Sequence, residues 1–154
     1  MDTPNEKLLV GSLEECDLPE LNIFSLDIRV DTGATTSSLH VDNIVNEKRD
    51  GDHWVSFDIH PDSHNVTKVV RRSAKVKSKR TIKSSNADKE QRYVIDTTLC
   101  LGGRNWLIEV TLTDRSNMSY LMLLGREAMC GRVVVDPELE NALGQRENTD
   151  ELNN

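Results

Sequence analysis

One short segment of the sequence carries the residue types of an acid–base site. Asp31, Thr32 and Gly33 follow directly on an alternating apolar run. A strand that ends in Asp-Thr-Gly places a carboxylate at a tight turn, and we expect Gly33 to adopt a backbone conformation there that a side chain would forbid. The Thr32 hydroxyl can tie the turn to a neighbour. Asp31 is therefore a candidate catalytic carboxylate, although the same three residues also occur in ordinary turns.

The chemistry open to this carboxylate depends on a second one. Peptide hydrolysis by this route needs two carboxylates about 3 Å apart, and the pair holds one proton because like charges that close cannot both ionise. The ionised member takes a proton from water, and the protonated member donates to the scissile carbonyl oxygen. This chain has one Asp-Thr-Gly. The second carboxylate must come from Asp31 of another copy, so we predict a symmetric homodimer whose turns are cross-linked by Thr32.

Alternation of apolar and polar residues predicts the strands that must position Asp31. The run 24–30 has an apolar side chain at every second position and leads straight into Asp31. Similar patterns or short continuous apolar runs mark further strands. These are expected at 55–59, at 121–124, at 133–135 and, around a Gly102-Gly103 turn, in a hairpin at 93–113. Because no long stretch has helical periodicity, we predict an all-β fold with one helical turn at 127–130.

The composition narrows the class of protein. Of 154 residues, 36% are apolar and 29% are charged, which is typical of a soluble globular domain. No apolar stretch is long enough to span a membrane, and residues 1–13 do not have the pattern of a signal peptide. Cys16, Cys100 and Cys130 are an odd, widely spaced set, so we expect a reducing, cytoplasmic compartment.

Two separated motifs together resemble the retropepsin-like aspartic peptidases. In that family an apolar strand leads to Asp-Thr-Gly-Ala, and a later apolar strand leads to Gly-Arg and a short helix. The matching positions are Asp31, Thr32, Gly33 and Ala34, then Leu123, Leu124, Gly125 and Arg126. The sequence is most similar to a bacterial and archaeal subgroup catalogued as ATP-dependent zinc proteases. Its pattern is matched by residues 30–34, Thr36, Ser37, Leu39 and His40, and by segments 84–86, 106–113 and 123–128.

This resemblance covers residues 8–138, which we take as one domain. It implies a closed β-barrel of the acid-protease type with one short helix. It also implies that Asp31, Thr32 and Gly33 form the catalytic centre and that Ala34, Gly125 and Arg126 support it. The polar residues 139–154 are expected to be a disordered C-terminal tail.

The sequence departs from the viral members of that family just after the Asp-Thr-Gly-Ala motif. Viral retropepsins usually have acidic residues there, which pair with the arginine of Gly-Arg. This chain has Thr35 and Thr36 instead. Arg126 must therefore find another acceptor or stay solvated, and the dimer contacts of the viral family are not expected here.

A basic segment spans residues 68–83, which contain eight basic residues and no acidic one. The rest of the chain carries 11 basic and 26 acidic residues. Lys75, Lys77 and Lys79 alternate, so on one strand they would share a face. They either discourage edge pairing of a solvated strand or form a basic wall that attracts an acidic peptide. Nucleic acid is not expected, because the chain is acidic overall and the segment lacks interleaved aromatic residues.

Neither half of the zinc and ATP label is supported by the residues. There is no His-Glu-x-x-His and no cysteine cluster. His60 and His64 have a spacing that suits a metal on a helix, but Pro61 indicates a loop, and we interpret His40 as a structural histidine. No glycine-rich phosphate loop is present. We therefore predict no metal and no cofactor, and any ATP dependence would come from a partner.

The favoured function is an aspartic endopeptidase. Relatives of the subgroup often occur beside ATP-grasp ligases, some of which add glutamates to proteins, so the resemblance implies a peptidase for acidic or isopeptide-linked tails. The lysines of the basic segment would then bind substrate. Two alternatives remain open, namely a peptide-binding module of the same fold without hydrolysis and a metal-dependent peptidase.

Overall fold

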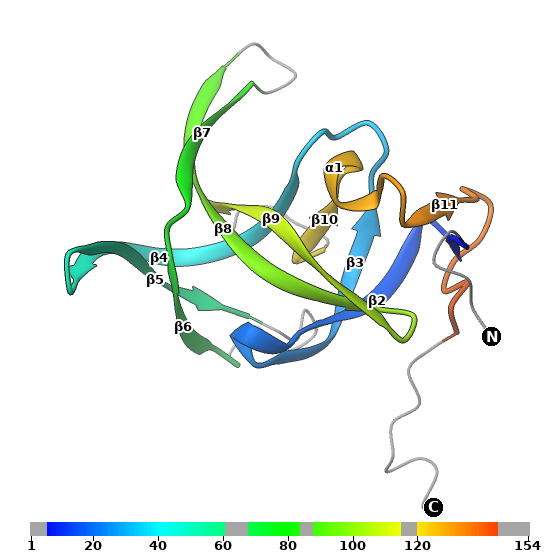
Figure 1. The fold of residues 1–154 in the computed structure, drawn as a ribbon, viewed down its shortest axis with the longest axis horizontal. Helices are drawn as coiled ribbons and strands as arrows, with labels where there is room; N and C mark the ends of the chain where they lie inside the picture. The colour runs from blue at the N-terminus through cyan, green and yellow to red at the C-terminus, as the bar shows by residue number, and fades with distance from the viewer. Residues whose placement is uncertain (1–5, 61–67, 84–87, 115–119, 145–154) are drawn as a thin grey trace, which may run out of the picture.

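The computed structural model describes residues 6–60, 68–83, 88–114 and 120–144. In chain order these residues form β1 (Leu8–Val10), β2 (Leu13–Leu18), the short 3-10 helix η1 (Pro19–Leu21), β3 (Ile23–Val30), β4 (Ser37–Arg49), β5 (Asp52–Ile59), β6 (Val70–Lys75), β7 (Ser78–Lys83), β8 (Lys89–Leu101), β9 (Arg104–Asp114), β10 (Met122–Leu124), α1 (Arg126–Met129) and β11 (Val133–Val135). The predicted all-β class with one short α-helix is confirmed (Figure 1). No helix in this part of the chain is long and apolar enough to cross a membrane.

Most of these strands belong to one sheet. Its order is β10-β3-β2-β8-β9-β4-β5-β6, and β10 also pairs with β4, so the pairings from β10 to β4 return to their starting strand. β7 joins this sheet by pairing with the first half of β8, and β1 and β11 form a separate parallel pair. The short strand β10 therefore has a neighbour on each side, and its closing position places the residues that follow it beside the end of β3.

The hydrophobic core is formed by the inward-facing members of the alternating runs. Val55, Phe57 and Ile59 of β5 are all fully buried, as their spacing predicted. On β3, Leu26 and Ile28 are also buried, but Phe24 is 55% exposed. The expected inward position of Phe24 is wrong, because Ser25 has a left-handed backbone and the register of β2 against β3 shifts between Cys16 and Leu18.

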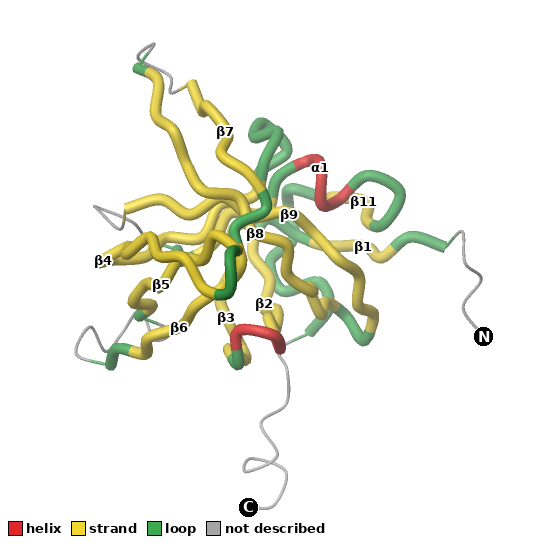
Figure 2. Tube along the Cα trace, turned by 60° about the vertical axis from the view of Figure 1, so that its left-hand side comes forward, coloured by secondary structure: helices red, strands yellow, loops and turns green. Residues whose placement is uncertain are grey.

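The predicted hairpin is formed by β8 and β9, with Gly102 and Gly103 at its turn. Both glycines have positive φ, 60° and 81°, which is the conformation of a two-residue turn that matches the twist of paired strands. β8 begins at Lys89, earlier than expected, and its first half pairs with β7. Figures 1 and 2 show this β7–β8 hairpin projecting away from the rest of the sheet.

The chain after β11 remains attached to the domain beyond the predicted boundary at residue 138. Glu14 is only 2% exposed, and its carboxylate accepts hydrogen bonds from the backbone N–H groups of Gly11 (2.7 Å), Ala142 (2.8 Å) and Leu143 (3.3 Å). A buried carboxylate needs such donors to offset its lost hydration. Residues 139–144 of the predicted tail are thus held by β2, and residues 145–154 lie outside the described residues.

Candidate active site

Asp31 lies where β3 leaves the sheet beside β10. The two strands are parallel and pair Val30 with Leu124, and the backbone N–H of Asp31 donates to the Leu124 carbonyl at 2.9 Å. The N–H of Val30 donates to the Ser12 carbonyl at 2.9 Å. The residue before Asp31 and the residue itself are therefore fixed by two different neighbours, and the Asp31 side chain is half-buried at this point.

Backbone N–H groups of the loop of residues 31–36 donate hydrogen bonds to Asp31. The Gly33 N–H donates to Asp31 Oδ1 at 2.9 Å, and the Ala34 N–H donates to the Asp31 carbonyl at 3.2 Å. Gly33 does not adopt a left-handed conformation. A side chain at Gly33 is disfavoured by space instead, because its Cβ would lie 3.2 Å from Asp31 Oδ1 and would press on the carboxylate.

Arg126 has acceptors in the loop, although Thr35 and Thr36 stand where an acidic partner was expected. Its guanidinium donates from Nη1 to the Thr32 carbonyl at 2.8 Å and from Nη2 to Thr35 Oγ1 at 2.9 Å. The backbone N–H groups of Arg126 and Glu127 donate to the carbonyls of Ala34 (2.8 Å) and Thr35 (3.0 Å). The start of α1 therefore clamps the loop through its side chain and backbone together, with the Thr35 hydroxyl as one of the acceptors.

Gly125 allows this close approach. Its N–H donates to the Ser37 hydroxyl at 2.9 Å, and both residues are buried. A Cβ at this position would lie 2.6 Å from the Thr36 carbonyl carbon and 2.8 Å from its oxygen. The helix is fixed from its other side by Trp106, whose indole N–H donates to the Ala128 carbonyl at 2.9 Å. Ala34, Gly125 and Arg126 thus lie together around the loop that carries Asp31.

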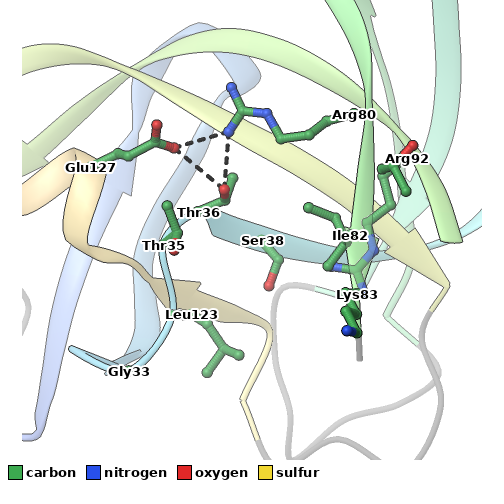
Figure 3. A pocket seen from close by; sticks show the side chains of 12 residues that line it. Gly33, Thr35, Thr36, Ser38, Arg80, Ile82, Lys83, Arg92, Leu123 and Glu127 are labelled. Carbon is green, nitrogen blue, oxygen red and sulfur yellow. Dashed lines mark hydrogen bonds and ion pairs between the residues drawn. The ribbon is translucent and has the colours of Figure 1, made fainter. Parts of the chain in front are cut away.

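A cavity of about 590 Å³ opens beside this loop. It is lined by Gly33, Ala34, Thr35, Thr36 and Ser38 from the loop and β4, by Arg80, Thr81, Ile82, Lys83 and Arg92 from the β7–β8 hairpin, and by Leu123 and Glu127. Asp31 lies next to this lining and is not part of it. Figure 3 shows Lys83 and Arg92 on the hairpin side of the cavity and Gly33 on the other side. Arg80 and Lys83 belong to the basic segment 68–83, whereas Arg92 lies outside it.

The three lysines that were selected do not share a strand face. β6 ends at Lys75 and β7 begins at Ser78, so Lys77 lies between strands that pair with different partners. Lys75 pairs with Asp52 (3.4 Å) and Lys77 with Glu109 (2.6 Å), while the Lys79 ammonium lies 5.4 Å from the centre of the Tyr93 ring. The expected common basic face is therefore wrong, because the chain changes sheet partner within the alternating run.

Charged groups connect the base of the hairpin to α1. The pKa of Glu109 is lowered, chiefly because Lys77 donates a hydrogen bond to it, with Arg80 acting in the same direction against the effect of burial. The pKa of Lys77 is raised because Glu109 and Asp96 accept from it. A carboxylate with a lowered pKa stabilises the folded state at pH values above its unfolded pKa and loses that contribution as the pH falls. Glu109 and Lys77 are therefore both charged at neutral pH.

The histidines do not gather into a metal centre in the described ranges. No group of three or more His, Cys, Asp or Glu side chains there could hold a metal ion. His60 Nε2 lies 2.7 Å from Asp42 Oδ2, and the His40 backbone N–H donates to the Leu121 carbonyl at 2.8 Å. His64 and the matched segment 84–86 lie outside the described residues. Cys16, Cys100 and Cys130 form no disulfide in this part of the chain.

Several known proteins are similar to this chain over most of its length. The model of the RimB-like family, described as retropepsin-like aspartic endopeptidase RimB, matches residues 9–145. Two similar relatives are both named "Probable alpha-L-glutamate ligase". One, from Shewanella pealeana, is 46% identical over 92% of this chain, and one, from Parasynechococcus marenigrum, is 49% identical over 90% of it.

These two alignments cover 31% and 30% of the relatives, so the chain spans about a third of the length of the curated proteins it matches. A solved structure of a Legionella pneumophila protein of unknown function is also similar. It has a TM-score of 0.73 at 28% identity, and the match covers 90% of this chain and 99% of that one.

Proposed function

Because the chain belongs to the RimB-like family of retropepsin-like aspartic endopeptidases, we propose that it hydrolyses peptide bonds with the Asp31 carboxylates of two copies. One observation carries the proposal. The half-buried Asp31 carboxylate is held by the Gly33 N–H in a loop that Arg126 and α1 clamp on the other side. A catalytic group fixed in this way loses little freedom when substrate binds, and such pre-positioning is a main source of rate enhancement.

The reaction follows from the chemistry of paired carboxylates. The two Asp31 side chains lie against each other at a twofold axis and share one proton. The ionised carboxylate removes a proton from a water molecule, whose oxygen attacks the peptide carbonyl, while the other carboxylate protonates the carbonyl oxygen. Collapse of the tetrahedral intermediate breaks the C–N bond, and the amine leaves with a proton from the pair. The Thr32 side chains hold the two loops together at the axis.

A candidate dimer face lies next to the site. β1 and β11 pair Leu9 with Val134, and these apolar side chains are 49% and 51% exposed. β11 follows α1 directly, and Ser12, just after β1, accepts from Val30 beside Asp31. The small sheet is thus connected to α1 through β11 and to the end of β3 through Ser12. We assign this face to the second copy, because burying apolar surface there brings two Asp31 loops toward one axis.

Substituting both Leu9 and Val134 by Asp is expected to leave the fold intact and give monomers at micromolar concentration, with loss of peptidase activity in parallel. Sedimentation velocity and peptide cleavage measure the two effects. Phe24→Asp is the matched control, because Phe24 is similarly exposed but lies at the far end of β3 from Asp31. Fully active monomers would contradict the shared site, and dimers that survive both substitutions would place the interface elsewhere.

The substrate that suits the cavity is an acidic peptide. Lys83 and Arg92 line it from the hairpin, opposite the loop that contains Gly33. Glutamate side chains of a bound peptide would meet these cations. The name of the glutamate-ligase relatives points to the same chemistry, because a ligase that adds glutamates makes acidic or isopeptide-linked tails. We assign this chain to the reverse step in the cytoplasm, in association with such an ATP-dependent ligase.

Lys83→Ala combined with Arg92→Gln is expected to lower kcat/KM for glutamate-rich peptides by about tenfold, since partly solvated charge pairs each contribute about 0.2–1 kcal/mol. The salt dependence of cleavage should fall as well. Lys75→Ala is the control, because Lys75 is a lysine of the same basic segment that lies outside the cavity lining. Equal losses for glutamate-rich and uncharged peptides would argue against charge recognition.

A further inference from the structure

Arg80 lies in the middle of β7 and contacts three other parts of the molecule. Its Nη1 donates to Thr36 Oγ1 and to Glu127 Oε1, both at 2.9 Å, and its Nη2 donates to Glu109 Oε1 at 2.9 Å. Figure 3 shows the guanidinium reaching from the hairpin to Thr36 and Glu127. The Arg80 side chain is 30% exposed. Its planar fork therefore joins the hairpin to the Asp31 loop, to α1 and to β9 at once.

The acceptors of Arg80 are themselves parts of the loop clamp. The Thr36 hydroxyl lies 3.3 Å from the same Glu127 Oε1 that Arg80 contacts. The Glu127 backbone N–H holds the Thr35 carbonyl, and the neighbouring Arg126 N–H holds Ala34. A displacement of the Arg80 guanidinium would thus loosen Thr36 and Glu127 together, on both sides of the loop that carries Asp31.

Among the described strands, β7 pairs with β8 alone, and Figures 1 and 2 show the two strands projecting from the sheet. Lys77, just before β7, shares Glu109 with Arg80 and so fixes the base of the same hairpin. Arg80 sits farther along β7, where the hairpin covers the cavity beside Gly33.

We propose that Arg80 is a positioning residue that latches the β7–β8 hairpin onto the Asp31 loop and thereby holds the loop and α1 in place. The contacts of Arg80 exist in the folded chain whatever reaction it catalyses. Only the effect of the latch on peptide hydrolysis rests on the proposed function. Both terminal nitrogens of Arg80 donate to protein acceptors, namely Thr36, Glu127 and Glu109, so we assign Arg80 a role through the loop and not in binding substrate.

Hydrogen–deuterium exchange of the full chain tests the latch without requiring activity. Arg80→Gln is expected to increase exchange of the loop and α1 amides, including those of Ala34, Arg126 and Glu127, by roughly tenfold, because hydrogen bonds to a charged group are lost. Arg80→Lys keeps the charge but not the fork, and should give an intermediate increase.

Arg92→Gln is the matched control. Arg92 lies on the same hairpin and lines the same cavity, and its substitution by Gln removes the same charge. Its ion pair, however, is with Glu90 of its own strand. Exchange at the loop should be unchanged in this variant. The latch is overturned if Arg80→Gln loosens only β7, or if Arg92→Gln loosens the loop equally. In an active enzyme Arg80→Gln should lower kcat more than it raises KM, and an inactive wild-type chain would count against the peptidase alone.

Discussion

Replacing Asp31 by Asn is expected to abolish peptide hydrolysis and to leave the fold unchanged. Asn has the same shape, and its Oδ1 can still accept from the Gly33 N–H at 2.9 Å, so the loop keeps its geometry. The amide cannot remove a proton from water. Since a positioned acid–base group contributes about 10²–10⁴-fold, the variant should lose about a thousandfold or more in kcat. Steady-state cleavage and circular dichroism measure the two parts of the prediction.

Asp27→Asn is the control for this substitution, because Asp27 is an exposed carboxylate on β3, the strand that leads into Asp31. Unchanged cleavage by Asp31→Asn would contradict the aspartic mechanism, and cleavage that only a chelator stops would favour a metallopeptidase. Peptide binding without cleavage by the wild-type chain would favour a binding module. The three classes of function therefore give different results with one variant, one chelator and one binding assay.

Mixing the variant with wild-type chain tests whether the site is shared. If each site needs Asp31 from both copies, a mixed dimer is inactive. Random exchange at equal amounts then leaves about a quarter of the dimers fully wild-type, and the activity follows the square of the wild-type fraction. A linear decline would mean that each chain works alone.

The retropepsin-like family and the all-β class, both predicted from the sequence, are confirmed. The strands that were predicted correctly, such as β3 and the β8–β9 hairpin, are those whose side chains alternate between interior and solvent. The extent of β4 was not predicted, because its second half leaves the core and exposes side chains of both alternating sets, Val45 and Asn46 among them. β2 was missed because polar residues, Glu14 and Asp17, occupy buried positions.

The residues around the cavity were predicted less completely, because most of them are far apart in the sequence. Asp31, Thr32 and Gly33 are neighbours in the chain, so a local motif contains them. Three different elements supply Arg80, Glu109 and Glu127. The contacts among these residues depend on the pairing of β7 with β8 and on the position of α1. The only local signal was the excess of basic residues in 68–83, which indicated a role but not which cations face the cavity.

Gly125→Ala is expected to lower the free energy of unfolding by about 3 kcal/mol, at the upper end of the cost of overpacking a tight site. Gly125 has φ of −93°, so alanine meets no backbone penalty there and would even gain slightly from reduced freedom of the unfolded chain. The opposing effect is larger. The new Cβ would lie 2.6 Å from the Thr36 carbonyl carbon and 2.9 Å from the Ser37 nitrogen, which are backbone atoms that cannot rotate away.

Relief of that contact must move α1 away from the Asp31 loop. The hydrogen bonds from the backbone N–H groups of Arg126 and Glu127 to the loop would lengthen, so activity should fall together with stability. Urea unfolding measures the stability change, and Gly103→Ala is the control. Gly103 has φ of +81° and open space around it, so alanine there costs only the left-handed backbone, about 1–2 kcal/mol, without touching the site. If Gly125→Ala cost less than this control and kept full activity, the close packing of α1 on the loop would not be what positions Asp31.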